Sequence, residues 1–193
     1  MTPKQRGIAA DPRSLLTGLG KIRTATIANL APAPVLTAGS VPPAGQGMAY
    51  LEIEGIPGES EILGREDTIT VFAYAWGVVA EGQRRRPRAE PAPLEVLMPT
   101  SSASVALWKA AGRGTVFPEM VLTVLRGDEH GAEVEHLRAT FDQAVVATFR
   151  TEPDPLGRGA VDVMTVRYAR ATYRVTGRDG GAAEAVLDFQ GSP

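Results

Sequence analysis

The sequence predicts a mainly β protein, a β-barrel or sandwich with one flanking helix. Three observations support this fold class. Alternating apolar and polar residues recur from residue 50 to the C-terminal region. Turn-forming stretches rich in glycine and charged residues separate these segments. Only the segment through Ala111 combines a capping residue, Thr100 or Ser101, with apolar residues at helical spacing and a glycine stop, which together predict a helix.

Residues 1–47 differ from the rest of the 193-residue chain. They hold six prolines, six glycines and no aromatic residue, and five basic residues against Asp11 give them a charge of +4. Because such a segment cannot bury much apolar surface, we expect a flexible N-terminal extension before one folded domain, residues 48–193. The extension has no unbroken apolar stretch of the kind found in signal peptides, so we expect no cleavable signal peptide.

The folded domain opens with two predicted strands and a long loop. Residues 50–54 alternate and end at Gly55, residues 58–67 are charged without apolar periodicity, and residues 69–80 form a continuous apolar strand. Both faces of this last strand are apolar, whereas the interior of a small barrel covers only one. We therefore expect a helix or a second subunit to cover the other face, through the larger side chains Phe72, Tyr74, Trp76 and Val78.

A basic loop and the helix come next. Residues 82–93 hold three prolines and an arginine cluster and are predicted to form a loop. Its arginines, expected either to contact an acidic cargo or to remain solvated, are Arg84, Arg85, Arg86 and Arg88. A short strand at 94–98 precedes the helix, whose side chains available for packing are Val105, Leu107, Trp108 and Ala111.

The remaining segments predict strands with breaks in their alternation. Residues 120–126 and 134–150 are joined by a polar turn, and the second would span about 50 Å if straight, so we expect a bend or bulge within it. Residues 161–175 change phase near Tyr168, which indicates a bulge. A glycine turn at 177–181 leads to a last strand at 185–189.

Composition argues against an enzyme. The chain has no cysteine, which excludes thiolate chemistry, and only two histidines, His130 and His136. These lie beside acidic residues in a predicted turn, where solvation explains them better than a metal does. The net charge of −2 and the absence of a long apolar run favour neither nucleic acid nor membrane insertion as a partner. We expect no catalytic constellation and no cofactor, which counts against a hydrolase that uses acidic residues.

An ordered set of segments makes the chain recognisable. These are residues 55–60 (GIPGES), Trp76-Gly77, the helix segment 107–111 (LWKAA), residues 119–126 (EMVLTVLR), which are similar to a family pattern EAxLTVRK, and the strand with Tyr168 and Tyr173. Together they resemble the haemolysin-coregulated protein (Hcp) family, the tube subunits of type VI secretion systems. The resemblance covers residues 48–191, about three quarters of the chain.

The resemblance implies a β-barrel subunit that forms hexameric rings, which stack into a hollow tube expelled by a contracting sheath. It implies sheath, spike and effector proteins as partners, effectors carried in the lumen, and assembly in the bacterial cytoplasm before export. The charged loop suits a contact between rings, through Glu59, Ser60, Glu61, Arg65 and Glu66. The alternative is a monomeric or dimeric β-barrel module that binds a small ligand or peptide. The mass in solution discriminates between the two.

Overall fold

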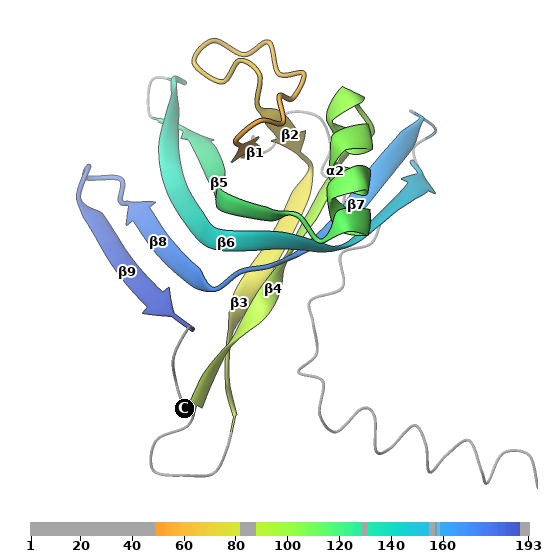
Figure 1. The fold of residues 1–193 in the computed structure, drawn as a ribbon. Helices are drawn as coiled ribbons and strands as arrows, with labels where there is room; N and C mark the ends of the chain where they lie inside the picture. The colour runs from red at the N-terminus through yellow and green to blue at the C-terminus, as the bar shows by residue number, and fades with distance from the viewer. Residues whose placement is uncertain (1–48, 82–87, 129–130, 155–156, 158, 190–193) are drawn as a thin grey trace, which may run out of the picture. The chain divides into compact units, whose positions relative to one another are not determined.

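The computed structural model describes residues 49–81, 88–128, 131–154, 157 and 159–189. The described residues form one antiparallel sheet of nine strands and one helix (Figure 1). The elements are β1 (Ala49–Ile53), β2 (Ile69–Val71), β3 (Ala73–Glu81), β4 (Arg88–Pro99), α2 (Ser102–Arg113), β5 (Val116–Gly127), β6 (Glu133–Pro153), β7 (Ala160–Arg167), β8 (Arg170–Thr176) and β9 (Ala182–Asp188). This confirms the predicted mainly β fold with a single flanking helix.

The sheet closes into a barrel at Phe72. The strand order is β2-β1-β5-β6-β7-β4-β3, so its two end strands are consecutive in the chain and separated by this one residue. The Phe72 N–H donates to the carbonyl of Leu97 in β4, 2.8 Å away. The prediction of one continuous strand over residues 69–80 was therefore wrong. The chain leaves its pairing with β1 and joins β4, because barrel closure requires it to change partner.

The barrel interior is filled by alternate residues of the central strands. Leu51, Leu94, Leu122, Phe141 and Met164 have essentially no exposed surface and belong to one apolar cluster. The alternation predicted for residues 50–54 holds, since Leu51 and Ile53 are buried while Glu52 and Glu54 are exposed. Burial on this scale is the main stabilising contribution to the fold.

Helix α2 forms where the capping signals predicted it and packs against β6. The N–H of the N-cap residue Ser101 donates to Ser104 Oγ at 2.8 Å, and Gly114 ends the helix in the left-handed conformation at φ 63°. Leu107 is fully buried. Val105 and Trp108, which we expected to pack, instead lie on the outer face, 71% and 68% exposed.

The long strand β6 bends as predicted. Its pairing with β7 changes register between Val146 and Thr148, and Gln143 adopts φ 52°. The phase change near Tyr168 was located correctly but has a different form, because residues 161–175 make two strands and not one with a bulge. β7 pairs with β4 and β6, whereas β8 pairs with β6 and β9.

The prediction of a loop over residues 82–93 was wrong for its second half, because β4 begins at Arg88. Residues 88–92 pair with β3 on one side, and the pairing of β4 with β7 starts only at Leu94. Pro91 and Pro93 are tolerated because a strand with a partner on one side does not need every N–H.

Candidate functional site

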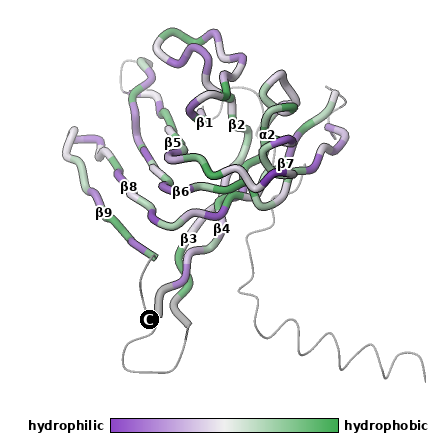
Figure 2. The backbone as a smooth tube through the Cα atoms, in the orientation of Figure 1, coloured by the Kyte–Doolittle hydropathy of each residue, from purple (hydrophilic) through white to green (hydrophobic). Residues whose placement is uncertain are grey.

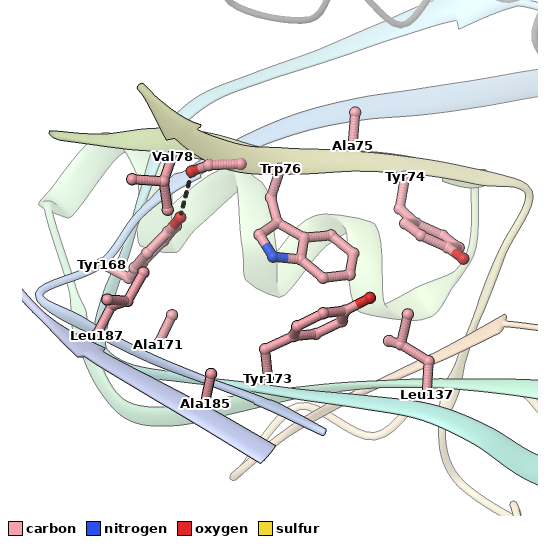
Figure 3. A pocket seen from close by; sticks show the side chains of 11 residues that line it. Tyr74, Ala75, Trp76, Val78, Leu137, Tyr168, Ala171, Tyr173, Ala185 and Leu187 are labelled. Atoms are coloured by element: carbon pink, nitrogen blue, oxygen red, sulfur yellow. Dashed lines mark hydrogen bonds between the residues drawn. The ribbon is translucent and has the colours of Figure 1, made fainter. Parts of the chain in front are cut away.

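An apolar cleft of about 510 Å³ lies between β3 and the hairpin of β8 and β9 (Figure 3). We call it the edge cleft. Uncharged and mostly apolar residues line it, namely Tyr74, Ala75, Trp76, Gly77, Val78, Leu137, Tyr168, Ala171, Tyr173, Ala185 and Leu187. Its lining therefore favours an apolar partner.

Trp76 joins the two sides of the edge cleft. Its ring centroid lies 5.7 Å from that of Tyr173 in β8, which faces it across the cleft (Figure 3). The centroid of Phe141 in β6 lies 5.8 Å away, and both contacts are edge to face. Such aromatic pairs add stability beyond the area that they bury. The floor of the cleft is therefore a fixed surface that links β3, β6 and β8.

Three of the four side chains predicted for a subunit interface line this cleft, and one does not. Tyr74 and Trp76 are half-buried, and Val78 is 45% exposed. Phe72 packs elsewhere, against a small cluster of Leu97, Val161 and Val163. It is separated from the other three because the strand is interrupted at this residue, between β2 and β3.

Tyr168 closes one end of the edge cleft. Its hydroxyl donates to the carbonyl of Ala92 at 2.8 Å and lies 3.5 Å from the carbonyl of Gly77. Burial raises the pKa of Tyr168 to about 12, so the hydroxyl stays protonated and remains a donor at physiological pH. This bond ties β3 and β4 to the start of β8.

Both strands that border the cleft have an edge without a partner among the described strands. β3 pairs with β4 alone, and β9 pairs with β8 alone. Every residue of β9 is exposed, including Val186 and Leu187. Unpaired apolar edges are where additional strands or subunits attach.

The predicted charged loop, residues 58–67, is held by backbone hydrogen bonds that include its flanking residue Thr68. The Gly58 N–H donates to the Asp67 carbonyl at 2.6 Å and the Ser60 N–H to the Thr68 carbonyl at 3.1 Å. Ser60, one of the residues predicted for a contact between rings, is buried. We call residues 57–68 the acidic loop.

Two of the charged side chains predicted to contact another ring are used within the subunit. Glu59 Oε1 accepts the N–H of Ser102, in the first turn of α2, at 2.8 Å, and this bond lowers the pKa of Glu59. Arg65 forms an ion pair with Glu135 of β6 at 3.6 Å. Glu61 and Glu66 remain exposed at the surface.

Sequence reasoning missed the tip of the acidic loop. Ile62 and Leu63 are exposed there, Leu63 by 92%. The signal was present as an apolar pair inside a charged segment, visible along the loop between β1 and β2 (Figure 2). Such a pair on an anchored loop is a candidate contact surface.

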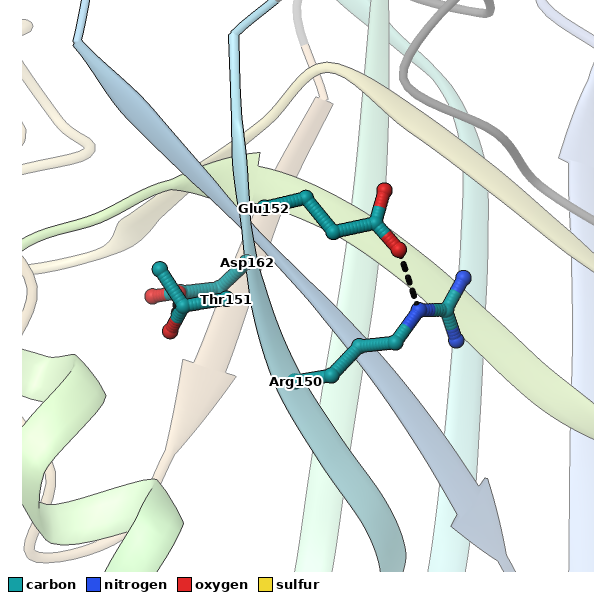
Figure 4. Close-up of polar contacts among 4 residues, drawn as sticks. All are labelled: Arg150, Thr151, Glu152 and Asp162. Carbon is teal, nitrogen blue, oxygen red and sulfur yellow. Dashed lines mark hydrogen bonds and ion pairs between the residues drawn. The ribbon is translucent and has the colours of Figure 1, made fainter.

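Asp162 supports the attachment point of this loop. Its fully buried carboxylate accepts hydrogen bonds from the hydroxyls of Thr100, Ser104 and Thr151. Thr151 lies next to Asp162 (Figure 4), with its hydroxyl oxygen 2.6 Å from Oδ1. These hydroxyls belong to the β4–α2 connection, α2 and β6. Asp162 of β7 therefore fixes the N-terminal end of the helix on which Glu59 is bound.

The arginine cluster falls largely outside the described residues. Arg84, Arg85 and Arg86 lie there, while the backbone of Arg88 belongs to β4 and not to a loop. His130 also lies outside, and His136 Nδ1 is 3.1 Å from both Arg126 Nη1 and the Thr176 carbonyl oxygen.

Within the described ranges, no group of three or more His, Cys, Asp or Glu side chains is arranged to hold a metal. Nor does any helix in that part of the chain combine the length and apolar character needed to cross a membrane.

Comparisons with known proteins identify the family. Residues 50–175 match the family described as type VI secretion system effector, Hcp. Hcp1 from Salmonella typhimurium is 21% identical over 75% of this chain and 95% of its own, with a TM-score of 0.64. A type VI secretion system effector from Yersinia pestis is 18% identical over 72% and 98%, with a TM-score of 0.62.

Hcp3 from Pseudomonas aeruginosa is 14% identical over 75% of this chain and 99% of its own, with a TM-score of 0.57. No curated protein matched the sequence. At these identities the structures establish a shared fold, and the family match covers most of the folded domain. The chain therefore belongs to the Hcp family of type VI secretion system effectors.

Proposed function

We propose that this protein is a tube subunit that closes into hexameric rings, and that the rings stack into a tube expelled by the secretion apparatus. The observation that carries the proposal is the edge cleft, where the unpaired edges of β3 and β9 flank an apolar surface. A second copy that contributes a strand there would satisfy the open backbone groups and bury Val78 and Leu187. Contacts between two different surfaces close into a ring when the rotation fits.

On this proposal the protein acts by assembly and catalyses no reaction. Apolar burial at the edge cleft holds the ring, while the acidic loop makes the smaller contacts between rings. Sheath, spike and effector proteins are the remaining partners, with effectors carried in the lumen. Assembly takes place in the bacterial cytoplasm and export follows through the apparatus.

The arginines at 84–86 and 88 are candidate contacts for an acidic effector. Four guanidinium groups within five residues would attract such a cargo at low ionic strength. Reversing Arg84, Arg85 and Arg86 to Glu should release an acidic effector from assembled rings without changing their mass. If the variant rings retain the effector, the arginines do not bind it, and the alternative of a solvated loop is favoured.

The test of the ring is the mass of the full chain by size-exclusion chromatography with light scattering, followed by negative-stain imaging. A mass near six times 20.4 kDa and rings with a central hole support the proposal. A monomer at high concentration would overturn it. It would favour the second candidate, a module that binds a small ligand or peptide, since the cleft has a volume typical of ligand pockets.

A further inference from the structure

We propose that the tip of the acidic loop docks on the C-terminal end of helix α2 of a second copy, in the neighbouring ring. The donor surface is Ile62 and Leu63. The receiving surface, which we call the helix patch, is a shallow pocket of about 530 Å³ lined by Trp108, Lys109, Ala111, Gly112, Arg113 and Phe149. This inference rests on the proposed function, because it assigns the contact by which rings stack.

The donor surface is apolar and already positioned. Leu63 is almost fully exposed, yet the loop is fixed on both sides of it. Glu59 accepts a hydrogen bond from the Ser102 N–H, and Arg65 forms an ion pair with Glu135. A contact residue on an anchored loop loses little conformational freedom on binding, which favours affinity. The exposed pair is therefore suited to insertion into an apolar pocket.

The helix patch has side chains that can bind an apolar loop tip. Trp108 is 68% exposed, although tryptophan is a residue that proteins bury or use at interfaces. Gly112 leaves open space beside it, because a Cβ built there would meet no atom within 4 Å. An aromatic wall beside a gap can accept a leucine side chain.

The charges of the two surfaces are complementary. Residues 58–67 carry four acidic residues against Arg65, a net charge of −3, and α2 carries Lys109 and Arg113 with no acidic residue. No charged residue lines the edge cleft. Electrostatic complementarity therefore favours the helix patch as the receptor for the acidic loop.

The arrangement also explains why the contact joins different copies. Glu59 attaches the loop at Ser102, in the first turn of α2, while the helical residues of the patch, Trp108 to Arg113, lie about 9–17 Å further along the helix. Two complementary surfaces at opposite ends of one element generate a head-to-tail stack. Each ring would present the tips of its acidic loops on one side and its helix patches on the other.

The test uses ring and tube assembly of the full chain. Leu63→Asp and the double variant Lys109→Glu/Arg113→Glu should each retain the ring mass and reduce stacking at least about tenfold. In an equal mixture, the intact loop tip of the Lys109→Glu/Arg113→Glu rings can still dock on the intact helix patch of the Leu63→Asp rings. No other combination is intact, so the mixture should form pairs of rings and no longer tubes. Arg178→Glu, an exposed arginine outside both surfaces, is the matched control and should stack normally.

A second measurement does not depend on tube formation. The chain has no cysteine, so Leu63→Cys subunits mixed with tagged Gly112→Cys subunits should form a disulfide-linked mixed dimer under added oxidant. Leu63→Cys mixed with Ala185→Cys, in the edge cleft, should not. Rings of the expected mass with equal or stronger linkage to Ala185→Cys would overturn this inference alone. A monomeric wild type without linkage would overturn the proposed function as well.

Discussion

Glu59 and Ser102 are 43 positions apart in the chain and are joined by a hydrogen bond of 2.8 Å between the Ser102 N–H and Glu59 Oε1. The bond places a carboxylate at the N-terminal end of α2, where the helix dipole favours negative charge. It couples the acidic loop to the element that carries the helix patch. The Glu59 carboxylate is therefore one of the groups that fix the position of the loop, together with the ion pair of Arg65 and Glu135.

Replacing Glu59 with Gln should loosen the acidic loop and change how stability depends on pH. The folded-state pKa of Glu59 lies below its ordinary value of 4.5, so its stabilising effect is present above that pH and is lost as the pH falls through the folded-state pKa. The difference in unfolding midpoint between wild type and Glu59→Gln should therefore shrink as the pH falls below 4.5. A difference that stays constant with pH would contradict this assignment, and Glu54→Gln, at an exposed position before the loop, serves as the control.

Asp162→Ala should lower the free energy of unfolding by about 3 kcal/mol, because the buried hydroxyl of Ser104 and the hydroxyls of Thr100 and Thr151 lose their acceptor. Asp162→Asn should cost less, since the amide oxygen still accepts. Glu184→Ala, in exposed β9, should change the free energy by less than about 0.5 kcal/mol. Chemical denaturation measures all three, and equal effects at Asp162 and Glu184 would exclude the proposed support of the helix.

The two tryptophans should behave oppositely. Trp76→Ala removes the ring contacts to Phe141 and Tyr173 and should destabilise the fold by about 2 kcal/mol or more. Trp108→Ala removes an exposed ring, so it should leave the free energy of unfolding almost unchanged while weakening ring stacking. Thermal unfolding and negative-stain imaging of both variants separate stability from assembly. Loss of stability in Trp108→Ala would be inconsistent with its outward position.

Gly58→Ala should disrupt the acidic loop, whereas Gly112→Ala should not disturb the fold. A Cβ at Gly58 would lie 2.1 Å from the carbonyl oxygen of Thr68, so the backbone there must move. The same addition at Gly112 meets nothing, and alanine is the better helix former by about 1 kcal/mol. Hydrogen exchange of the loop amides should rise in Gly58→Ala alone. Protection equal to wild type would show that the loop tolerates the displacement.

Leu187→Asp should prevent ring closure without unfolding the subunit. The side chain is 42% exposed on an edge strand, so a charge there costs little in the isolated subunit but would be buried against a second copy. Light scattering should report a monomer with an unchanged circular dichroism spectrum. The control is Glu184→Gln on the same strand, which should assemble normally. A ring of unchanged mass for Leu187→Asp would move the interface away from the edge cleft.

The sequence alone was sufficient for features set by neighbouring residues. The helix at Ser102–Arg113 has its serine cap and glycine stop within one segment, and its existence followed from them. The alternation of β1 and the bend in β6 followed in the same way, from side-chain period and strand length. The mainly β fold class is the sum of such local signals.

Which segments face one another could not be predicted from local sequence patterns. Phe72 interrupts an unbroken apolar run because β2 and β3 pair with different strands, and Tyr168 marks a change of partner between β7 and β8. The partners of Glu59 and Arg65 within the subunit, Ser102 and Glu135, could likewise not be predicted from the sequence. The hydrophobic period of a segment shows which of its residues share a face. The element that packs against that face depends on contacts between residues far apart in the chain, because these residues come together only when the barrel closes.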